Sequence, residues 1–315
     1  MKIPWTTGRP GQAGMALIAL LLLSFSPLAA GGKLNVVAAT TDLAALVTEV
    51  GGDRINVTAI ARGYQDPHFV EAKPSFLLSL RKADLLVVVG LQLEIGWLPP
   101  LITQSGNPRI QPGGPGYFDA SQSAEILEIP TAQVSRAMGD VHPLGNPHYW
   151  LDPLNGLRVA GGLVQKLSQM SPADSAYFHQ CLEDFRRRLT DAGKRWDEQM
   201  KPYRGRKVIT YHQSWPNFVK RFGLQVVDYV EPRPGIPPSP AHVVELIALM
   251  KRQGVKLILV EPYFDLKTPQ SVARETGGQV VVLMPSVGGN KEAGDYIQLF
   301  DYDINLLVKA FQQTR

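Results

Sequence analysis

Residues 34–60, LNVVAATTDLAALVTEVGGDRINVTAI, contain the pattern that decides the fold. The β-branched run Leu34–Ala39 predicts a strand, and the apolar spacing that follows predicts a helix through Val50, with Thr41 as its N-cap. Ile55–Ile60 predicts a second strand. A strand, a helix and a second strand in this order indicate an α/β fold with a parallel sheet covered by helices.

The same alternation continues and predicts two α/β lobes joined by one long helix. Ser171 as an N-cap and Pro172 in the first turn predict a connecting helix to about Met200, a rod of roughly 40 Å. The other elements expected before it are a helix at Pro74–Lys82, a strand at Leu85–Val89, mostly loop with short extended pieces over 103–147, and a helix at Asn155–Met170. After it we expect strands at Lys207–Tyr211, Gln225–Tyr229, Leu257–Val260 and Val280–Leu283, and helices near 215–222, 242–253, 267–276 and 295–313.

Composition excludes several classes of protein. The 315 residues are 44% hydrophobic and 19% charged, as in a globular protein rather than a collagen-like, coiled-coil or disordered one. The single cysteine, Cys181, excludes an internal disulfide and any CxxC metal or redox motif. Basic residues are scattered apart from Arg186-Arg187-Arg188, and no basic stripe is interleaved with aromatic residues, so we expect no nucleic-acid partner.

The N-terminus predicts a cleaved signal peptide. Lys2 and Arg9 precede the apolar run Met15–Phe25, and small residues follow it up to Gly31. This run is shorter than the ~20 residues that a membrane span needs, although an uncleaved anchor helix is the alternative. No cysteine lies nearby for a lipid anchor, and removing residues 1–30 lowers the net charge from +4 to +2. We therefore expect a periplasmic protein with four parts: signal peptide 1–30, N-terminal lobe 31–170, linking helix 171–203 and C-terminal lobe 204–315.

Three of the six histidines lie where a parallel sheet presents functional side chains. His68 lies in the loop after the strand that ends near Ile60, and His212 follows the strand that starts at Lys207. Sites in open α/β sheets form beyond the carboxyl ends of the strands. His148 lies in a proline-rich turn before the next helix. Neutral imidazole is a preferred ligand of Zn²⁺ and also suits Cu, Fe and Ni, although a hydrogen-bonding loop role fits each histidine taken alone.

The remaining histidines and the nearby acids receive lesser roles. We expect His142 to be a loop residue within reach of the site, and His179 and His242 to be structural. A ligating histidine usually donates its second ring N–H to an acceptor. The candidate acceptors are Asp66, Asp152 and Glu261. Asp152 equally suits a charge at a helix N-terminus.

Together these motifs resemble the metal-binding solute receptors of zinc and manganese ABC importers. The resemblance covers nearly all of the mature chain and is carried by Asp66-Pro67-His68, Ala83–Gly90 with Glu94 and Trp97, Asn146–Pro153, Thr210-Tyr211-His212 and Val260-Glu261-Pro262. It implies two (β/α) lobes with parallel sheets joined by a rigid helix, and a metal site in the cleft between the lobes. By motif match, the ligands of the family fall on His68, His148 and His212.

The resemblance also bears on the metal. In this family a histidine at the third ligand position goes with zinc and a glutamate with manganese, and His212 agrees with the preference of imidazole for zinc. The usual fourth ligand, an aspartate after the last strand, is replaced here by Met284. A thioether is a poor zinc ligand, which leaves the fourth position open to water, to His142, or to a carboxylate such as Glu261 or Asp66.

The sequence therefore predicts a periplasmic solute-binding protein, not an enzyme, that captures Zn(II) and delivers it to an ABC permease of the inner membrane. We expect it to be a monomer. A receptor of the same family for Mn(II) or another divalent metal is the alternative. A secreted zinc hydrolase with Glu261 as general base is less well supported, because HExxH and GxSxG motifs are absent. The sequence does not distinguish an extracellular adhesin in which the metal is structural.

Overall fold

The computed structural model describes residues 1–5, 32–132, 134, 138–139 and 141–314. The chain divides into two compact units, Met1–Gly31 and Gly32–Arg315. Residues 1–5 are exposed and form no helix or strand, and the rest of the predicted signal peptide lies outside the described residues. Within the part of the chain that is described, no helix is both long and apolar enough to cross a membrane. Every element below belongs to Gly32–Arg315.

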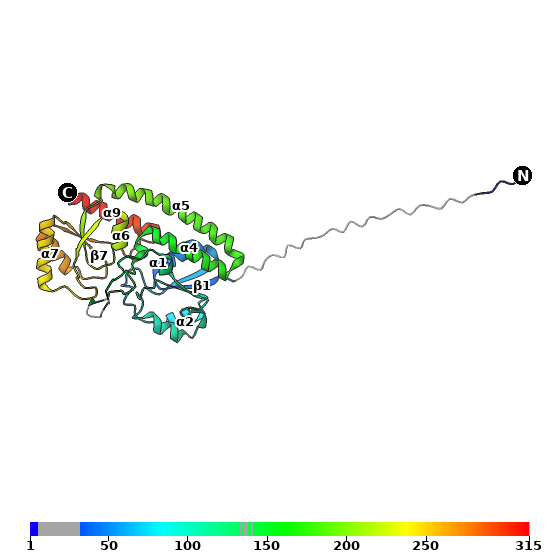
Figure 1. Cartoon of the computed structure of the whole chain (residues 1–315), viewed down its shortest axis with the longest axis horizontal. Coiled ribbons are helices and arrows are strands. Elements are labelled where there is room, and N and C mark those ends of the chain that lie inside the picture. The colour runs from blue at the N-terminus through cyan, green and yellow to red at the C-terminus, as the bar shows by residue number, and fades with distance from the viewer. Residues whose placement is uncertain (6–31, 133, 135–137, 140, 315) are drawn as a thin grey trace. The chain divides into compact units, whose positions relative to one another are not determined.

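Two parallel four-stranded sheets form the framework of this unit (Figure 1). The first has the strand order β2-β1-β3-β4 and the second the order β6-β5-β7-β8, so one topology occurs twice. The strands are β1 Leu34–Ala38, β2 Ile55–Ala59, β3 Leu85–Val88, β4 Tyr117–Asp119, β5 Lys207–Thr210, β6 Gln225–Tyr229, β7 Leu257–Val260 and β8 Gln279–Val282. We call the first sheet with its helices the first lobe and the second sheet with its helices the second lobe.

Helices cover both faces of each sheet, as the alternating sequence pattern predicts. The α-helices are α1 Thr41–Gly51, α2 Pro74–Lys82, α3 Leu98–Ser105, α4 Pro153–Met170, α5 Ser175–Met200, α6 Pro216–Phe222, α7 Pro240–Gln253, α8 Lys267–Thr276 and α9 Tyr296–Gln313. Short 3₁₀ helices occur at Gly52–Arg54, Pro108–Ile110, Ala120–Ser123, Tyr149–Leu151, Pro172–Asp174 and Lys201–Tyr203. Helices α2 and α3 bury apolar residues against one face of the first sheet, and α7 and α8 do so against one face of the second.

The opposite faces of the two sheets share one continuous core. It contains buried residues of α1, α4, α5 and α9, so it runs through both lobes. Along α5, Phe185 lies 6.2 Å from Tyr296 and Trp196 lies 5.3 Å from Phe300, measured between ring centroids. Helix α5 has 26 residues and therefore spans about 39 Å. Because close-packed cores resist deformation, we expect this shared core to limit the movement of one lobe against the other.

The predicted elements are present, with corrections at their ends. Thr40 rather than Thr41 caps α1, because its hydroxyl accepts the Leu43 N–H. The connecting helix does not begin at Ser171: its hydroxyl donates to the Asp174 carboxylate, a 3₁₀ turn follows, and α5 begins at Ser175. The sequence did not predict α3, Leu98–Ser105, whereas the short strand β4 agrees with the short extended pieces expected within 103–147.

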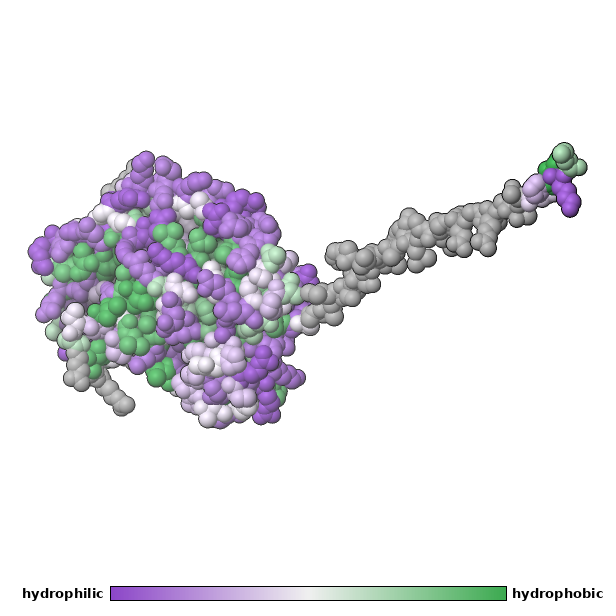
Figure 2. All heavy atoms as spheres, turned by 45° about the vertical axis from the view of Figure 1, so that its right-hand side comes forward, coloured by the Kyte–Doolittle hydropathy of each residue, from purple (hydrophilic) through white to green (hydrophobic). Residues whose placement is uncertain are grey.

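The outer face of α5 is strongly hydrophilic. Hydrophilic residues cover the upper part of the face in Figure 2, where Figure 1 places α5. The three consecutive arginines of this helix do not form a free basic patch, because each is paired with an acid. Their partners are Glu183 for Arg186, Asp184 for Arg187, and Asp184 and Glu49 for Arg188.

Candidate metal centre

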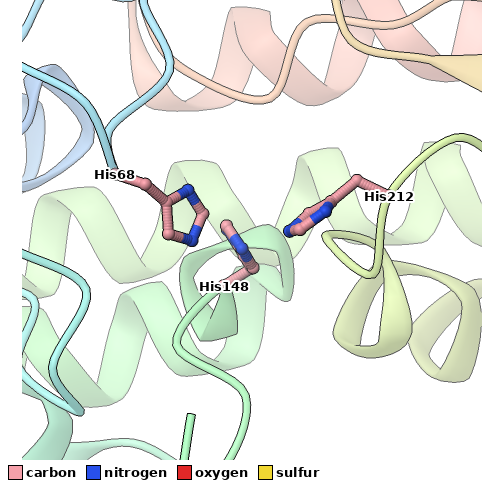
Figure 3. Close-up of side chains that lie close together, drawn as sticks. All are labelled: His68, His148 and His212. Carbon is pink, nitrogen blue, oxygen red and sulfur yellow. The ribbon is translucent and has the colours of Figure 1, made fainter. Parts of the chain in front are cut away.

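The structure brings together the three histidines that the sequence singled out. His68, His148 and His212 each place one ring nitrogen within 4.8 Å of the other two. Their ring centroids lie 5.2 to 5.8 Å apart, and the rings point toward one another (Figure 3). His68 and His148 belong to the first lobe and His212 to the second. The cluster therefore lies in the cleft between the lobes.

The loop after β2 holds His68 with its Nε2 atom directed into the cluster. The Asp66 carboxylate accepts hydrogen bonds from the His68 backbone N–H at 2.9 Å and from its ring Nδ1 at 2.7 Å. Trp97 Nε1 donates to the carbonyl of Pro67 and anchors the loop. Burial raises the pKa of Asp66, but the hydrogen bonds from His68 outweigh that effect and leave the pKa lowered. In a neutral His68 ring, the ionised carboxylate favours the tautomer with the proton on Nδ1 and the lone pair on Nε2.

His212 is oriented in the same way by an acid of the neighbouring strand. It lies two residues beyond the end of β5, and its Nδ1 is 2.9 Å from an oxygen of Glu231, which follows β6. The side chains are 8% and 6% exposed. Glu231 is not among the acids that the sequence singled out. The sequence feature that could have identified Glu231 is its position just beyond a predicted strand. Because β5 and β6 are adjacent and parallel, residues after their carboxyl ends lie at the same edge of the sheet.

His148 is the most deeply buried ligand candidate. It precedes the 3₁₀ turn Tyr149–Leu151, and its backbone N–H donates to the Asn146 side chain. The Asn146 amide also donates to the carbonyl of Gln213, beside His212, and so links the loops of two candidates. Both ring nitrogens of His148 are buried without a hydrogen-bond partner among the described residues. Burial holds the pKa of this imidazole well below its usual range.

A fourth histidine, His142, lies closer to the cluster than its sequence context indicated. Its Nε2 is 3.2 Å from Nε2 of His68, and its Nδ1 is 3.1 Å from the carbonyl oxygen of Leu91. Burial lowers the pKa of His142 to about 4, so its ring is neutral near pH 7. His179 lies exposed on α5, and His242 bonds the Tyr229 carbonyl in the first turn of α7.

The other carboxylates singled out in the sequence have different roles. Asp152 caps α4, because its carboxylate accepts the Leu154 N–H. Glu261 is fully buried and accepts a hydrogen bond from Trp215 Nε1, and burial raises its pKa to about 8. Neither is hydrogen-bonded to a histidine in the described residues. Met284 is buried, and its sulfur packs against Gly289.

The cluster has the chemistry of a site for a divalent metal ion that prefers nitrogen ligands. His68 and His212 each bond a carboxylate through Nδ1, which leaves Nε2 to bind an ion, and neutral His148 presents one lone pair. The orphaned ring nitrogens of His148 are costly to bury, and a bound cation would satisfy one of them. No carboxylate oxygen of the described residues belongs to the group. Imidazole ligands suit zinc, whereas oxygen ligands suit manganese and magnesium.

A small cavity leads to the cluster. Its volume is about 50 Å³, and its wall includes Glu128, His142, His148 and His212. At least part of the cluster therefore faces a cavity rather than packed side chains.

Comparison with known proteins gives one consistent result. The family described as zinc-uptake complex component A, periplasmic (ZnuA), matches residues 36–310. The chain is 24% identical over 315 residues to the metal ABC transporter substrate-binding lipoprotein ScbA of Streptococcus cristatus, covering 94% of this chain and 98% of that protein. It is 23% identical over 284 residues to the high-affinity zinc uptake system protein ZnuA of Bacillus subtilis strain 168, with 88% and 87% covered. A crystal structure of ZnuA shares the fold, with a TM-score of 0.73 at 23% identity over 88% of this chain and 99% of that chain.

Proposed function

This chain belongs to the ZnuA family of periplasmic zinc-uptake components, and we propose that it captures Zn(II) through His68, His148 and His212 and delivers it to an ABC importer. The observation that carries the proposal is the convergence of three imidazoles from two lobes within 4.8 Å of one another. Members of this family are substrate-binding proteins of metal ABC transporters, which favours binding and release over catalysis.

The donor set favours zinc over manganese. Relatives include the manganese ABC transporter substrate-binding lipoprotein ScaA of Streptococcus gordonii as well as the zinc uptake protein of Bacillus subtilis, so family membership leaves the metal open. In this chain the third position is His212, and the acid beside it, Glu231, bonds its Nδ1 instead of joining the group. An all-imidazole group supports zinc, because carboxylate ligands are what manganese prefers.

The location of the site suggests how the permease recognises loaded protein. Metal bound to ligands of both lobes favours the arrangement in which the lobes are together. The shared core along α5 keeps that movement small. We propose that the inner-membrane permease recognises this arrangement on a monomeric receptor.

The proposal includes export and processing. We propose that residues 1–30 are removed as a signal peptide and that the mature protein is free in the periplasm, since Cys181, the single cysteine, is far from that segment in sequence. Mass spectrometry of the protein recovered from periplasm tests both points. A mass equal to the full chain, or fractionation with the membrane, would contradict them.

Metal titration tests the site. Metal-stripped mature protein is titrated with Zn²⁺ and then Mn²⁺ in a calorimeter, beside His68→Ala and His212→Ala. We expect one tight zinc site, weaker manganese binding and a loss of orders of magnitude in zinc affinity in both variants. His179→Ala, which removes an exposed imidazole of α5, is the matched control and should bind zinc like the wild type. Unchanged zinc affinity in His212→Ala would refute the site.

A cellular assay tests delivery. Cells that lack this protein should accumulate less zinc in chelator-treated medium, and the wild-type gene should restore accumulation while the His148→Ala gene should not. Equal restoration by His148→Ala at equal protein level would exclude a transport role for the site.

A further inference from the structure

We propose that His142 is the fourth ligand of the metal site and supplies the donor that Met284 cannot. The inference rests on the proposed function and deepens it, because it makes the site a set of four imidazoles. Its basis is the position of His142, which contacts His68, and the orientation of its ring.

The hydrogen bonds of His142 prepare its ring for a cation. Its Nδ1 lies 3.1 Å from the carbonyl oxygen of Leu91, an acceptor without a proton, so Nδ1 carries the ring hydrogen and Nε2 carries the lone pair. His68 has the same arrangement, with Nδ1 bonded to Asp66. A ring N–H donated to a carboxylate or backbone carbonyl is the usual support of a metal-ligating histidine. His142 is thus oriented as His68 and His212 are.

The distance between the two rings also fits a shared ion. The Nε2 atoms of His142 and His68 are 3.2 Å apart, and both present lone pairs, so neither donates to the other while the rings are neutral. In a tetrahedral zinc site with Zn–N bonds of about 2.0–2.1 Å, two ligand nitrogens lie roughly 3.3–3.4 Å apart. A cation in contact with both atoms removes the repulsion. His142 is not part of the group of histidines whose ring nitrogens all lie within 4.8 Å of one another. Metal binding must therefore draw the His142 ring toward His148 and His212.

The backbone that receives His142 is held in an unusual conformation. Leu91 and Gln92 have φ angles of +52° and +67°, in the left-handed region that non-glycine residues rarely adopt, and they follow Gly90 at +82°. The buried carboxylate of Glu94 accepts the Gly90 N–H and helps hold this turn. Such strain persists where the surrounding structure enforces it, and it is concentrated at functional sites. Here it turns the Leu91 carbonyl toward the His142 ring.

His142 also lies where a fourth ligand could shield a bound ion from solvent. It lines the 50 Å³ cavity that contains His148 and His212. It also lines a second, open cavity of about 370 Å³ beside His68 and Phe69. The side chain therefore stands between the cluster and this larger cavity, where its binding to an ion would complete the coordination and separate the ion from solvent.

Cobalt spectroscopy and zinc titration of His142→Gly test the proposal. Co²⁺ replaces zinc as a probe whose visible bands report the number and type of ligands. We expect the tetrahedral bands of the wild type to weaken and shift in the variant. The zinc dissociation constant should rise by at least about 10- to 100-fold, because the loss of a group that merely supports a metal ligand already lowers metal affinity by that much. Added free imidazole, which the adjoining cavity has room for, should restore the cobalt bands. His242→Gly, which removes an imidazole bonded to another backbone carbonyl, is the matched control.

The outcomes separate this proposal from the one it rests on. If wild type binds zinc, His68→Ala abolishes binding, and His142→Gly leaves both affinity and cobalt bands unchanged, the fourth ligand is refuted and the three-histidine receptor stands. If zinc affinity falls but the cobalt bands keep their shape and imidazole restores nothing, His142 is a structural residue of the loop and the proposal fails. If wild type binds no zinc, the proposed function fails, and the fourth ligand with it.

Discussion

Replacing Glu231 by Gln should weaken zinc binding although it removes no ligand. The Glu231 carboxylate lies 2.9 Å from Nδ1 of His212, and both side chains are at least 92% buried. The substitution preserves the shape but removes the charge, and an amide can present its N–H₂ and stabilise the wrong tautomer of His212. Loss of such a supporting group typically costs 10- to 100-fold in metal affinity, or about 1.4–2.7 kcal/mol.

A comparison with Asp66→Asn predicts an order of effects. The Asp66 side chain, which supports His68, is 20% exposed, whereas that of Glu231 is 6% exposed. Water screens the first pair more strongly, so Asp66→Asn should lose less zinc affinity than Glu231→Gln. Glu128→Gln is the matched control, because Glu128 lines the adjoining cavity but bonds the Asn146 amide rather than a histidine.

Competition against a chelator of known zinc affinity measures the dissociation constants of wild type and of the three variants. Thermal unfolding of each metal-free variant verifies that the fold is intact. Wild-type affinity in Glu231→Gln would refute the argument that the carboxylate orients His212. An equal loss in Glu128→Gln would show that net charge near the site, rather than orientation, sets the affinity.

Three further predictions concern stability. His148→Leu removes buried ring nitrogens without partners, so it should raise the free energy of unfolding of the metal-free protein by about 1–3 kcal/mol in urea titrations. The same substitution should abolish the zinc-induced rise in Tm. A variant less stable than wild type would contradict this prediction. Burial raises the Glu261 pKa to about 8. The free energy of unfolding of metal-free wild type should therefore fall by up to about 4 kcal/mol as pH rises from about 4.5 to 8, whereas Glu261→Gln should lack this loss. Parallel curves of stability against pH for the two proteins would disprove this. Free zinc at 100 times its dissociation constant should add about 2.7 kcal/mol to the free energy of unfolding of the wild type. Removing the metal with a chelator should leave the circular dichroism spectrum unchanged. Unfolding by the chelator would instead indicate a structural metal.

Local sequence patterns predicted most of the helices and strands, but not α3, Leu98–Ser105. Alternation of β-branched runs with amphipathic segments predicted α2, β6, β7 and α8 with the bounds that the structure has. These elements have strong local signals, such as proline in the first turn of α2 and the all-apolar strand β7. Errors occurred where side-chain contacts decide the start of a helix. Ser171 bonds Asp174 instead of a backbone N–H, and α5 begins later than predicted.

The chain order alone determined which three histidines follow strands or precede a helix, and therefore which ones are ligand candidates. Convergence of His68, His148 and His212 depends on the packing of two sheets around α5 and α9, and no local pattern contains that information. The same is true of Glu231, which is 19 residues from His212, and of His142, which is 74 residues from His68. Contacts between residues so far apart in sequence form only when the tertiary fold brings strand ends and loops together. The sequence thus determined the candidate donor atoms, and the tertiary structure decided their tautomers, their burial and their neighbours.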